Sequence, residues 1–242
     1  MKTDKITYAM GALTAEGVLA YDETIHGHRP AVLMAPNWMG LTDKAIERAK
    51  LLAGRRYVVF VADMYGQGTR PADFGEAAAL AGPLRENAIE HRMRIRAAYD
   101  AMIAEGTKQN LIDGRRAAIG FCFGGNNVLE LARDGADIAA AVSIHGGLTT
   151  ARAAEAGAVK AALLVAHGAP DPVAPKADRD AFEAEMDAAG AKWTMLLFSG
   201  VLHAYTDQGA DVPGVAAWHE PSTRQTYALA HQFIADAFAG QL

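Results

Sequence analysis

The chain contains a single cysteine, and its setting suits a nucleophile. Cys122 is the centre of the pentapeptide Gly120-Phe121-Cys122-Phe123-Gly124, which follows an apolar run and leads into a helical pattern. A tight strand-to-helix turn of this kind holds its central residue in a strained backbone conformation. The positions two before and two after that residue lie against neighbouring chain, so both require glycine. We therefore predict that Cys122 is a nucleophile presented on a sharp turn.

A cysteine nucleophile needs a base, and the base needs a group that orients it. Asp171 follows an apolar run at residues 161–166, and His203 follows another at residues 194–198. Because both residues come directly after predicted strands, we expect them at the same edge of the sheet as Cys122. The order nucleophile, acid, histidine is the order found in α/β-hydrolases. The sequence therefore predicts a triad in which His203 is the base and then the acid, while Asp171 fixes its tautomer.

A developing oxyanion needs two preorganised backbone N–H donors. We expect one from Phe123, because free amides and the helix dipole at the start of a helix point toward the nucleophile. We expect the other from Trp38, in the loop 35–40 after the first central strand. The same helix N-terminus and His203 together would favour the thiolate form of Cys122.

Each of these residues also has a simpler interpretation. A lone cysteine is usually a small core hydrophobe, Asp171 could be a turn residue between two prolines, and His203 could be a solvated loop histidine. The flanking glycines, the preceding strand and the order of the three residues favour catalysis. His145, which ends a strand near the site, is expected in the pocket wall rather than in catalysis, and His231 is expected in the core.

Composition limits the classes of function. The chain has 242 residues, of which 51% are hydrophobic, so we predict one α/β domain over residues 1–242. A net charge of −5 gives no reason to expect nucleic acid as a partner. No apolar run approaches the roughly 18 residues of a membrane helix, and the polar stretch at residues 1–5 lacks the apolar character of a signal peptide. His26 and His28 have no further ligands nearby, so we expect no metal site.

The single cysteine excludes an intramolecular disulfide, which fits a reducing compartment. We therefore expect a cytoplasmic protein that is a monomer or a small homo-oligomer, with a small molecule as its partner and no membrane association.

Continuous apolar runs predict buried parallel strands, since strands covered on both faces do not alternate. The predicted strands are residues 31–35, 58–62, 117–121, 138–142, 161–166 and 194–198. Helical patterns are predicted at residues 42–55, 83–105 and 175–189, after Cys122, and in a last helix carrying Tyr227, His231, Ile234 and Phe238. Residues 6–8 and 12–21 are expected to be antiparallel edge strands. The fold class is thus α/β, with a mostly parallel central sheet and helices on both faces, as in the α/β-hydrolase fold.

Residues 65–82 fit neither a strand nor a helix pattern well. They leave the carboxyl end of a predicted strand, where open α/β sheets bind ligands. They are either a loop that shapes the substrate site or a plain connection.

Taken together, these motifs resemble the dienelactone hydrolase family over nearly the whole chain. The resemblance rests on Leu33-Met34-Ala35-Pro36-Asn37-Trp38-Met39-Gly40, Ala62-Asp63-Met64-Tyr65-Gly66, Gly120-Phe121-Cys122-Phe123-Gly124-Gly125, Asp171 and His203. It implies hydrolysis of small esters and lactones through an acyl-thioester intermediate, without a cofactor. It also implies the same triad of Cys122, Asp171 and His203, with Trp38 and Phe123 supplying the oxyanion hole.

Two residues depart from the family pattern. Asn37 stands where members that act on dienelactone carry a glutamate that helps to generate the thiolate, so activation here rests on His203 alone or on a thiolate already formed. Asp207 stands four residues after His203, where those members use an arginine to hold the substrate carboxylate. Arg70 and Arg85 are the candidate replacements for that arginine. We therefore expect a neutral ester or lactone rather than dienelactone, in a pocket lined by Asn37, Tyr65, His145 and Tyr205.

Two other classes of protein remain as alternatives. Flavodoxin-like proteins, including glutamine amidotransferases and thiol stress sensors, also place a cysteine at a strand-to-helix turn. Amidotransferases carry a glutamate two residues after the histidine, where this chain has Tyr205. A ligand-binding or regulatory protein with little turnover could also use a hydrolase fold. The acid that lies between Cys122 and His203 in the sequence favours the hydrolase.

Overall fold

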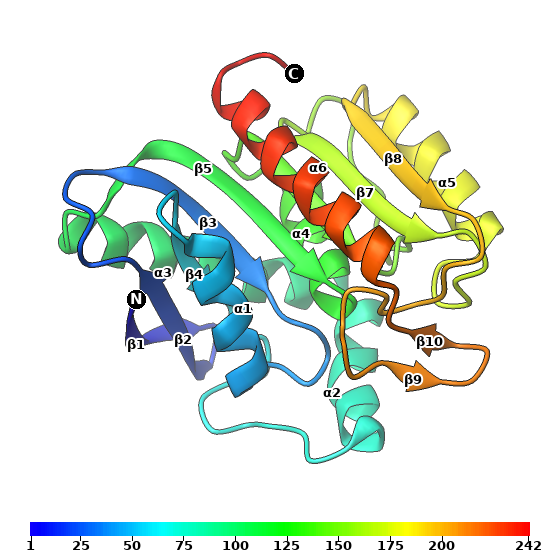
Figure 1. Ribbon diagram of the computed structural model, residues 1–242, viewed down its shortest axis with the longest axis horizontal. Helices are drawn as coiled ribbons and strands as arrows, with labels where there is room; N and C mark the ends of the chain where they lie inside the picture. Colours follow the sequence, from blue (N-terminus) through cyan, green and yellow to red (C-terminus); the bar gives the residue numbers. More distant parts are fainter.

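The centre of the fold is an eight-stranded sheet, which the computed structural model describes together with the rest of residues 1–242 (Figure 1). The strand order is β1-β2-β4-β3-β5-β6-β7-β8. The parallel strands are β3 (Arg29–Ala35), β4 (Val58–Val61), β5 (Ile112–Phe121), β6 (Ala140–Ile144), β7 (Ala162–Gly168) and β8 (Trp193–Phe198). An antiparallel hairpin of β1 (Lys2–Met10) and β2 (Leu13–Tyr21) pairs with β4. The mostly parallel sheet and its antiparallel edge are both confirmed.

Helices cover both faces of this sheet (Figure 1). One face carries α1 (Asp43–Ala53) and α6 (Glu220–Phe238), and the other carries α3 (Ala88–Lys108), α4 (Phe123–Arg133) and α5 (Lys176–Ala188). Successive strand residues point to opposite faces, so Met34 packs in one buried cluster with Ile234, whereas Leu33 packs in the other with Ile95. Each face has its own apolar core, and this is why the strands read as continuous apolar runs.

The segment between β4 and α3 differs from the sequence prediction. Residues 65–82 do not form one loop, because α2 (Phe74–Glu86) begins within them. Asp73 caps this helix by accepting a hydrogen bond from the Glu76 amide at 2.9 Å. Pro83, the first residue of the predicted helix, lies inside α2.

The helix predicted at residues 83–105 is therefore two helices. Asn87 ends α2 and caps α3, its side chain accepting a hydrogen bond from the Glu90 amide at 3.1 Å. The sequence also gave no sign of β9 (Asp211–Val212) and β10 (Ala216–Ala217), a two-stranded hairpin after β8.

Parallel strands bring their carboxyl ends to one edge of the sheet, and the loops that leave this edge carry the candidate site residues. Residues 36–42 follow β3, Cys122 follows β5, residues 169–175 follow β7, and residues 199–210 follow β8.

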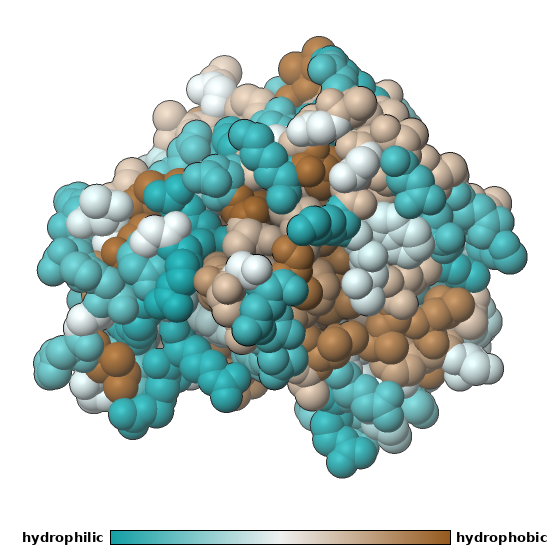
Figure 2. All heavy atoms as spheres, turned by 90° about the horizontal axis from the view of Figure 1, so that it is seen from above, coloured by the Kyte–Doolittle hydropathy of each residue, from teal (hydrophilic) through white to brown (hydrophobic).

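No helix is both long enough and apolar enough to cross a bilayer. Hydrophilic side chains spread over the face drawn in Figure 2, and apolar side chains gather in smaller areas between them. The larger apolar assemblies are the two internal clusters on either side of the sheet.

Two glycines allow the start of α4 to approach the sheet closely. A Cβ on Gly120 would overlap the Gly124 carbonyl, and a Cβ on Gly124 would overlap the carbonyls of Ala35 and Pro36. These neighbours are backbone atoms, which cannot rotate away as a side chain can. The two glycines therefore set the distance between the turn at Cys122 and the loop after β3.

We predict that Gly124→Ala lowers the free energy of unfolding by at least about 2 kcal/mol, because the added methyl group forces α4 away from β3. Urea denaturation of the purified variant measures this loss. Gly114→Ala, in β5 but with no atom within 4 Å of its added Cβ, is the matched control and should stay within about 0.5 kcal/mol of wild type. Equal stability of the two variants would contradict the close-approach account.

Candidate active site

Cys122 occupies the turn between β5 and α4, in the strained conformation that the glycines imply. Its φ and ψ angles are 54° and −118°, a region that side-chain-bearing residues rarely adopt. The residue is half-buried and its thiol is free. The thiol is thus presented at the carboxyl edge of the sheet rather than packed in the core.

The structure brings His203 and Asp171 to Cys122, as predicted. His203 Nε2 lies 3.2 Å from Cys122 Sγ, and His203 Nδ1 lies 2.9 Å from Asp171 Oδ2. The other carboxylate oxygen of Asp171 accepts a hydrogen bond from the Val173 amide at 2.8 Å. Only 6% of His203 and 1% of Asp171 are exposed. This chain of contacts runs from a buried carboxylate through an imidazole to a thiol.

The backbone of His203 is held by the β9–β10 hairpin. The His203 amide donates to the Val215 carbonyl at 3.0 Å, and the Ala217 amide donates to the His203 carbonyl at 3.2 Å. A third close approach fixes the same loop, because a Cβ on Gly168 would overlap the Val201 carbonyl. The loop that carries His203 is therefore locked against the end of β7, from which Asp171 projects.

Electrostatics make His203 the charged histidine of the site. Burial by itself would lower the pKa of His203, but hydrogen bonds to Asp171 and to Cys122 raise it to about 9. Burial would raise the pKa of Asp171, but interactions with His167 and His203 hold it well below its usual value. The arrangement therefore favours an imidazolium at His203 beside a carboxylate at Asp171.

The two expected oxyanion donors are available. Neither the Phe123 amide nor the Trp38 amide donates to another backbone group, and Cys122 contributes no side-chain cap to α4. The contact of Gly124 with Ala35 brings the two segments together. The loop after β3 and the turn at Cys122 thus each contribute one backbone N–H group without a hydrogen-bond partner, that of Trp38 and that of Phe123.

Asn37 and Tyr65, which were predicted to line the pocket, brace the loop that carries Trp38. The Tyr65 hydroxyl donates to the Trp38 carbonyl at 2.8 Å, and the Met39 amide donates to Asn37 Oδ1 at 3.0 Å. Both contacts hold the peptide unit that follows Trp38. The Tyr65 ring also stacks on Phe123, with centroids 6.1 Å apart and planes 7° apart. Tyr65 therefore joins the segments that carry the two candidate oxyanion donors.

His145 and Tyr205 do not line an open pocket, which corrects the sequence prediction. His145 is 2% exposed and lies behind Cys122. Tyr205 is fully buried in the core, where its hydroxyl lies 2.9 Å from Thr226 Oγ1. Both residues follow strands at the correct edge, but their side chains turn inward, which a strand-end position alone does not reveal.

The charged residues named as substitutes for the family arginine have different surroundings. Arg70 donates to the carbonyls of Gly66 and Thr69, whereas the Arg85 guanidinium lies over the Phe123 ring at 5.1 Å. Arg85 therefore contacts the residue whose amide is a candidate oxyanion donor, and Arg70 does not. The Asp207 side chain accepts a hydrogen bond from the Gly209 amide at 3.2 Å and shapes its own turn.

Comparison with known proteins agrees with this geometry. The model of the dienelactone hydrolase family matches residues 16–236. The chain belongs to the dienelactone hydrolase family. Its members are hydrolases, and the sequence resemblance to them is thereby confirmed. The search of curated proteins found no match.

Solved structures of dienelactone hydrolase-like proteins share this fold. A structure named m3DLH is 34% identical, with a TM-score of 0.91 and coverage of 98% of both chains. P91, a dienelactone hydrolase-like promiscuous phosphotriesterase from metagenomic libraries, is 33% identical, with a TM-score of 0.90 and coverage of 98% of both chains. A dienelactone hydrolase from Anabaena variabilis shares the fold at 17% identity and a TM-score of 0.67, over 97% of both chains. These likenesses confirm the α/β-hydrolase architecture.

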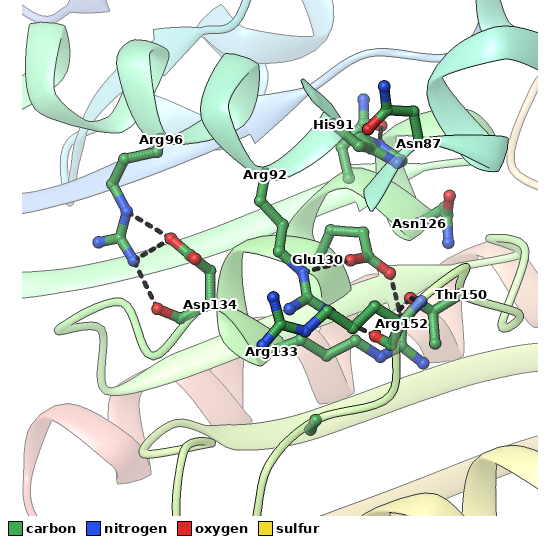
Figure 3. A network of polar contacts seen from close by, with 12 residues as sticks. Asn87, His91, Arg92, Arg96, Asn126, Glu130, Arg133, Asp134, Thr150 and Arg152 are labelled. Atoms are coloured by element: carbon green, nitrogen blue, oxygen red, sulfur yellow. Dashed lines mark hydrogen bonds and ion pairs between the residues drawn. The ribbon is translucent and has the colours of Figure 1, made fainter. Parts of the chain in front are cut away.

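In this dienelactone hydrolase-family protein, a buried ion-pair network holds α4 behind the site (Figure 3). Glu130 of α4 accepts from Arg92 at 2.8 Å and from Arg133 at 3.0 Å. Arg133 also donates to Glu185 at 2.7 Å and to the Leu148 carbonyl at 2.8 Å. The network ties α4 to α3, α5 and the loop after β6, so the helix that begins beside Cys122 is anchored on three sides.

Sequence reasoning missed three residues near the site. Thr206 contacts His145, and His167 lies fully buried 3.7 Å from Asp171 Oδ2. Phe74 is 60% exposed and stacks on Trp38 with ring centroids 5.5 Å apart. The sequence signal for His167 was its position at the end of a strand, just before Asp171. Phe74 could not be found, because α2 itself was not predicted.

No group of three or more His, Cys, Asp or Glu side chains is arranged to hold a metal ion.

We predict that wild-type stability depends on pH through His203. Because its pKa rises from 6.5 to about 9 on folding, the contribution is complete below pH 6.5 and is lost as pH rises through about 9. The free energy of unfolding of wild type relative to His203→Gln should fall by up to about 3 kcal/mol over this range. Denaturation of both proteins at a series of pH values measures the difference. Parallel curves would contradict the raised pKa.

Proposed function

We propose that this protein hydrolyses small carboxylic esters or lactones through a thioester on Cys122. The observation that supports this most strongly is the contact chain from buried Asp171 through His203 to Cys122 Sγ, which lies 3.2 Å from the imidazole. A nucleophile, a base within hydrogen-bond reach and a group that orients the base are the three parts that acyl transfer requires.

In the acylation step, the Cys122 thiolate attacks the carbonyl carbon while His203 is an imidazolium. The carbonyl oxygen becomes an oxyanion, which the amides of Trp38 and Phe123 stabilise. The intermediate then collapses, the C–O bond to the leaving group breaks, and His203 gives its proton to the departing alkoxide. The products are a thioester on Cys122 and an alcohol, or a thioester with a tethered alcohol when the substrate is a lactone.

In the deacylation step, neutral His203 takes a proton from water, which attacks the thioester carbonyl. The C–S bond breaks, and the acid leaves with the thiolate and the imidazolium restored. Asp171 keeps the proton of His203 Nδ1 directed toward its carboxylate through both steps. Asn37 cannot donate a proton and its side-chain oxygen is engaged with Met39. We therefore assign thiolate formation to His203.

The charges near the site support a neutral substrate. The Arg70 guanidinium is held by backbone carbonyls and lies 3.7 Å from Asp63, and Asp207 adds a negative charge in the loop that carries His203. The Arg85 guanidinium packs on the Phe123 ring and is exposed, so solvent screens its attraction for a substrate carboxylate. We propose a neutral acyl group of small size.

Phosphotriester hydrolysis is a second candidate activity. It is favoured by one observation, the 33% identity over 98% of both chains with P91, which is described as a promiscuous phosphotriesterase. A thiolate beside two N–H donors also suits attack at a tetrahedral phosphorus centre, where negative charge likewise develops on an oxygen.

We expect Cys122→Ala to reduce kcat/KM for the best ester by at least about 10³-fold, because no other side chain can form the acyl intermediate. The assay compares p-nitrophenyl esters of increasing chain length, a δ-lactone, a carboxylate-bearing ester of matched size and a p-nitrophenyl phosphotriester. An unchanged unfolding temperature shows that the variant is folded. Retention of a tenth of the activity would contradict the nucleophile. Preference for the anionic ester, lost in Arg85→Gln, would contradict the neutral substrate.

Tyr65→Phe tests the brace of the oxyanion loop. Loss of the hydroxyl that holds the Trp38 carbonyl should lower kcat by about tenfold and leave KM within about twofold, since the donor acts on the transition state. Tyr99→Phe is the matched control, because its hydroxyl also donates to a backbone carbonyl, that of Asp137, at 2.6 Å. Equal kcat values for the two variants would show that the brace has no part in turnover.

A further inference from the structure

His145 is a buried histidine that the proposed mechanism does not use, although both of its ring nitrogens make contacts at the site. Its Nδ1 accepts a hydrogen bond from the Cys122 amide at 3.1 Å. Its Nε2 lies 2.8 Å from Thr206 Oγ1. The imidazole therefore spans the short distance between the nucleophile's own peptide and the loop that carries the base.

These contacts determine the tautomer of His145. A peptide N–H can only donate, so Nδ1 must carry a lone pair and the single ring proton must be on Nε2, where it is donated to Thr206. Burial, and then the positive charges of His203 and Arg48, hold the pKa of His145 well below 6.5, while Asp171 acts in the opposite direction. The ring is thus neutral and oriented by both partners.

The bridging residue and the nucleophile that it contacts both have strained backbones. Cys122 and His145 both have left-handed backbone conformations, with φ angles of 54° and 40°. The Cys122 amide also donates to the Ile144 carbonyl at 3.0 Å, and the His145 amide donates to the Ala166 carbonyl at 2.8 Å. Strain of this kind persists only where the surroundings hold it, and the imidazole is one of the groups that do so.

The other end of the bridge controls the position of the base. Thr206 lies three residues after His203, and its carbonyl accepts from Arg48 at 3.3 Å. The rings of His145 and His203 meet edge to face with centroids 5.2 Å apart. A shift of the imidazole would therefore move Cys122 and the His203 loop relative to one another.

We propose that His145 is a positioning residue that sets the separation of Cys122 and His203 by bridging the nucleophile's peptide N–H and the Thr206 hydroxyl. The inference rests on the proposed function, because it concerns the same thiol and base. It differs from a core histidine in a simple way. His231 stacks on Tyr57 with centroids 6.1 Å apart, and its Nδ1 has no partner, whereas His145 uses both nitrogens on the site.

Two substitutions separate the two halves of the bridge. In His145→Asn, the amide oxygen can replace Nδ1 as acceptor for Cys122, but the group for Thr206 is lost. In His145→Gln, the amide nitrogen can replace Nε2 as donor to Thr206, but the acceptor for Cys122 is lost. Thr206→Val removes the hydroxyl but leaves the strained residues Cys122 and His145 unchanged. It therefore tests the bridge if the His145 variants do not fold. His231→Gln is the control for loss of a half-buried histidine away from the site.

The first readout is alkylation of Cys122 by iodoacetamide as a function of pH, which requires no substrate and reports on the chain's single cysteine. The second is the separation of kcat from KM with the best ester. We expect each His145 variant and Thr206→Val to change the alkylation profile and to lower kcat by at least about tenfold, with KM within about twofold. The double variant His145→Asn/Thr206→Val should be no slower than His145→Asn, because one bridge is broken in both. His231→Gln should match wild type.

Alkylation profiles and kcat values within twofold of wild type in folded variants would overturn the inference. The two readouts also distinguish this failure from failure of the proposed function. If wild type hydrolyses no ester while the alkylation profile still responds to His145, the bridge stands and the hydrolase does not. If wild type hydrolyses esters while the variants behave as wild type in both readouts, the bridge fails and the hydrolase stands.

Discussion

The site depends on backbone segments that approach one another more closely than a Cβ would allow. Gly120 and Gly124 let α4 start directly beside β3, and Gly168 lets the loop that carries His203 pack on the end of β7. The first contact places the Phe123 amide near the Trp38 loop, and the second places His203 within reach of Asp171. Because the atoms in contact are peptide groups, these distances do not depend on side-chain rotamers. The reactive geometry is therefore a property of the fold itself.

Charge at the site is concentrated on one histidine among three. His203 is paired with a carboxylate and a thiol, so its pKa is raised to about 9, whereas burial lowers the pKa values of His145 and His167. The neutral imidazole of His145 then serves as an oriented spacer rather than as a competing base, whereas neither ring nitrogen of buried His167 has a hydrogen-bond partner. This difference follows from their partners, since His203 alone contacts both Asp171 and Cys122. Two-step acyl transfer requires a single base that donates its proton to the leaving group and then takes a proton from water, and His203 is that base.

Most of the fold could be predicted from the sequence, because the central strands are buried on both faces and therefore appear as continuous apolar runs. The candidate triad could also be predicted, since the glycines around Cys122 and the order of Asp171 and His203 along the chain can be read directly from the sequence. The β9–β10 hairpin was not predictable, because strands of two residues have no periodicity. The inward orientation of His145 and Tyr205 depends on tertiary packing, and the bracing roles of Asn37 and Tyr65 depend on contacts with a loop that no spacing reveals.

The central claim is that Cys122 carries the acyl group during turnover. The most direct test is intact-protein mass spectrometry of wild type and His203→Ala, quenched at intervals after mixing with an activated ester, followed by peptide mapping of the single cysteine. At about pH 9, where a cysteine thiol ionises without a neighbouring base, the account predicts an acyl mass on Cys122 that accumulates in His203→Ala, because water is no longer activated, and decays in wild type. Absence of any acyl mass in either protein, while the ester is still consumed by wild type, would contradict it.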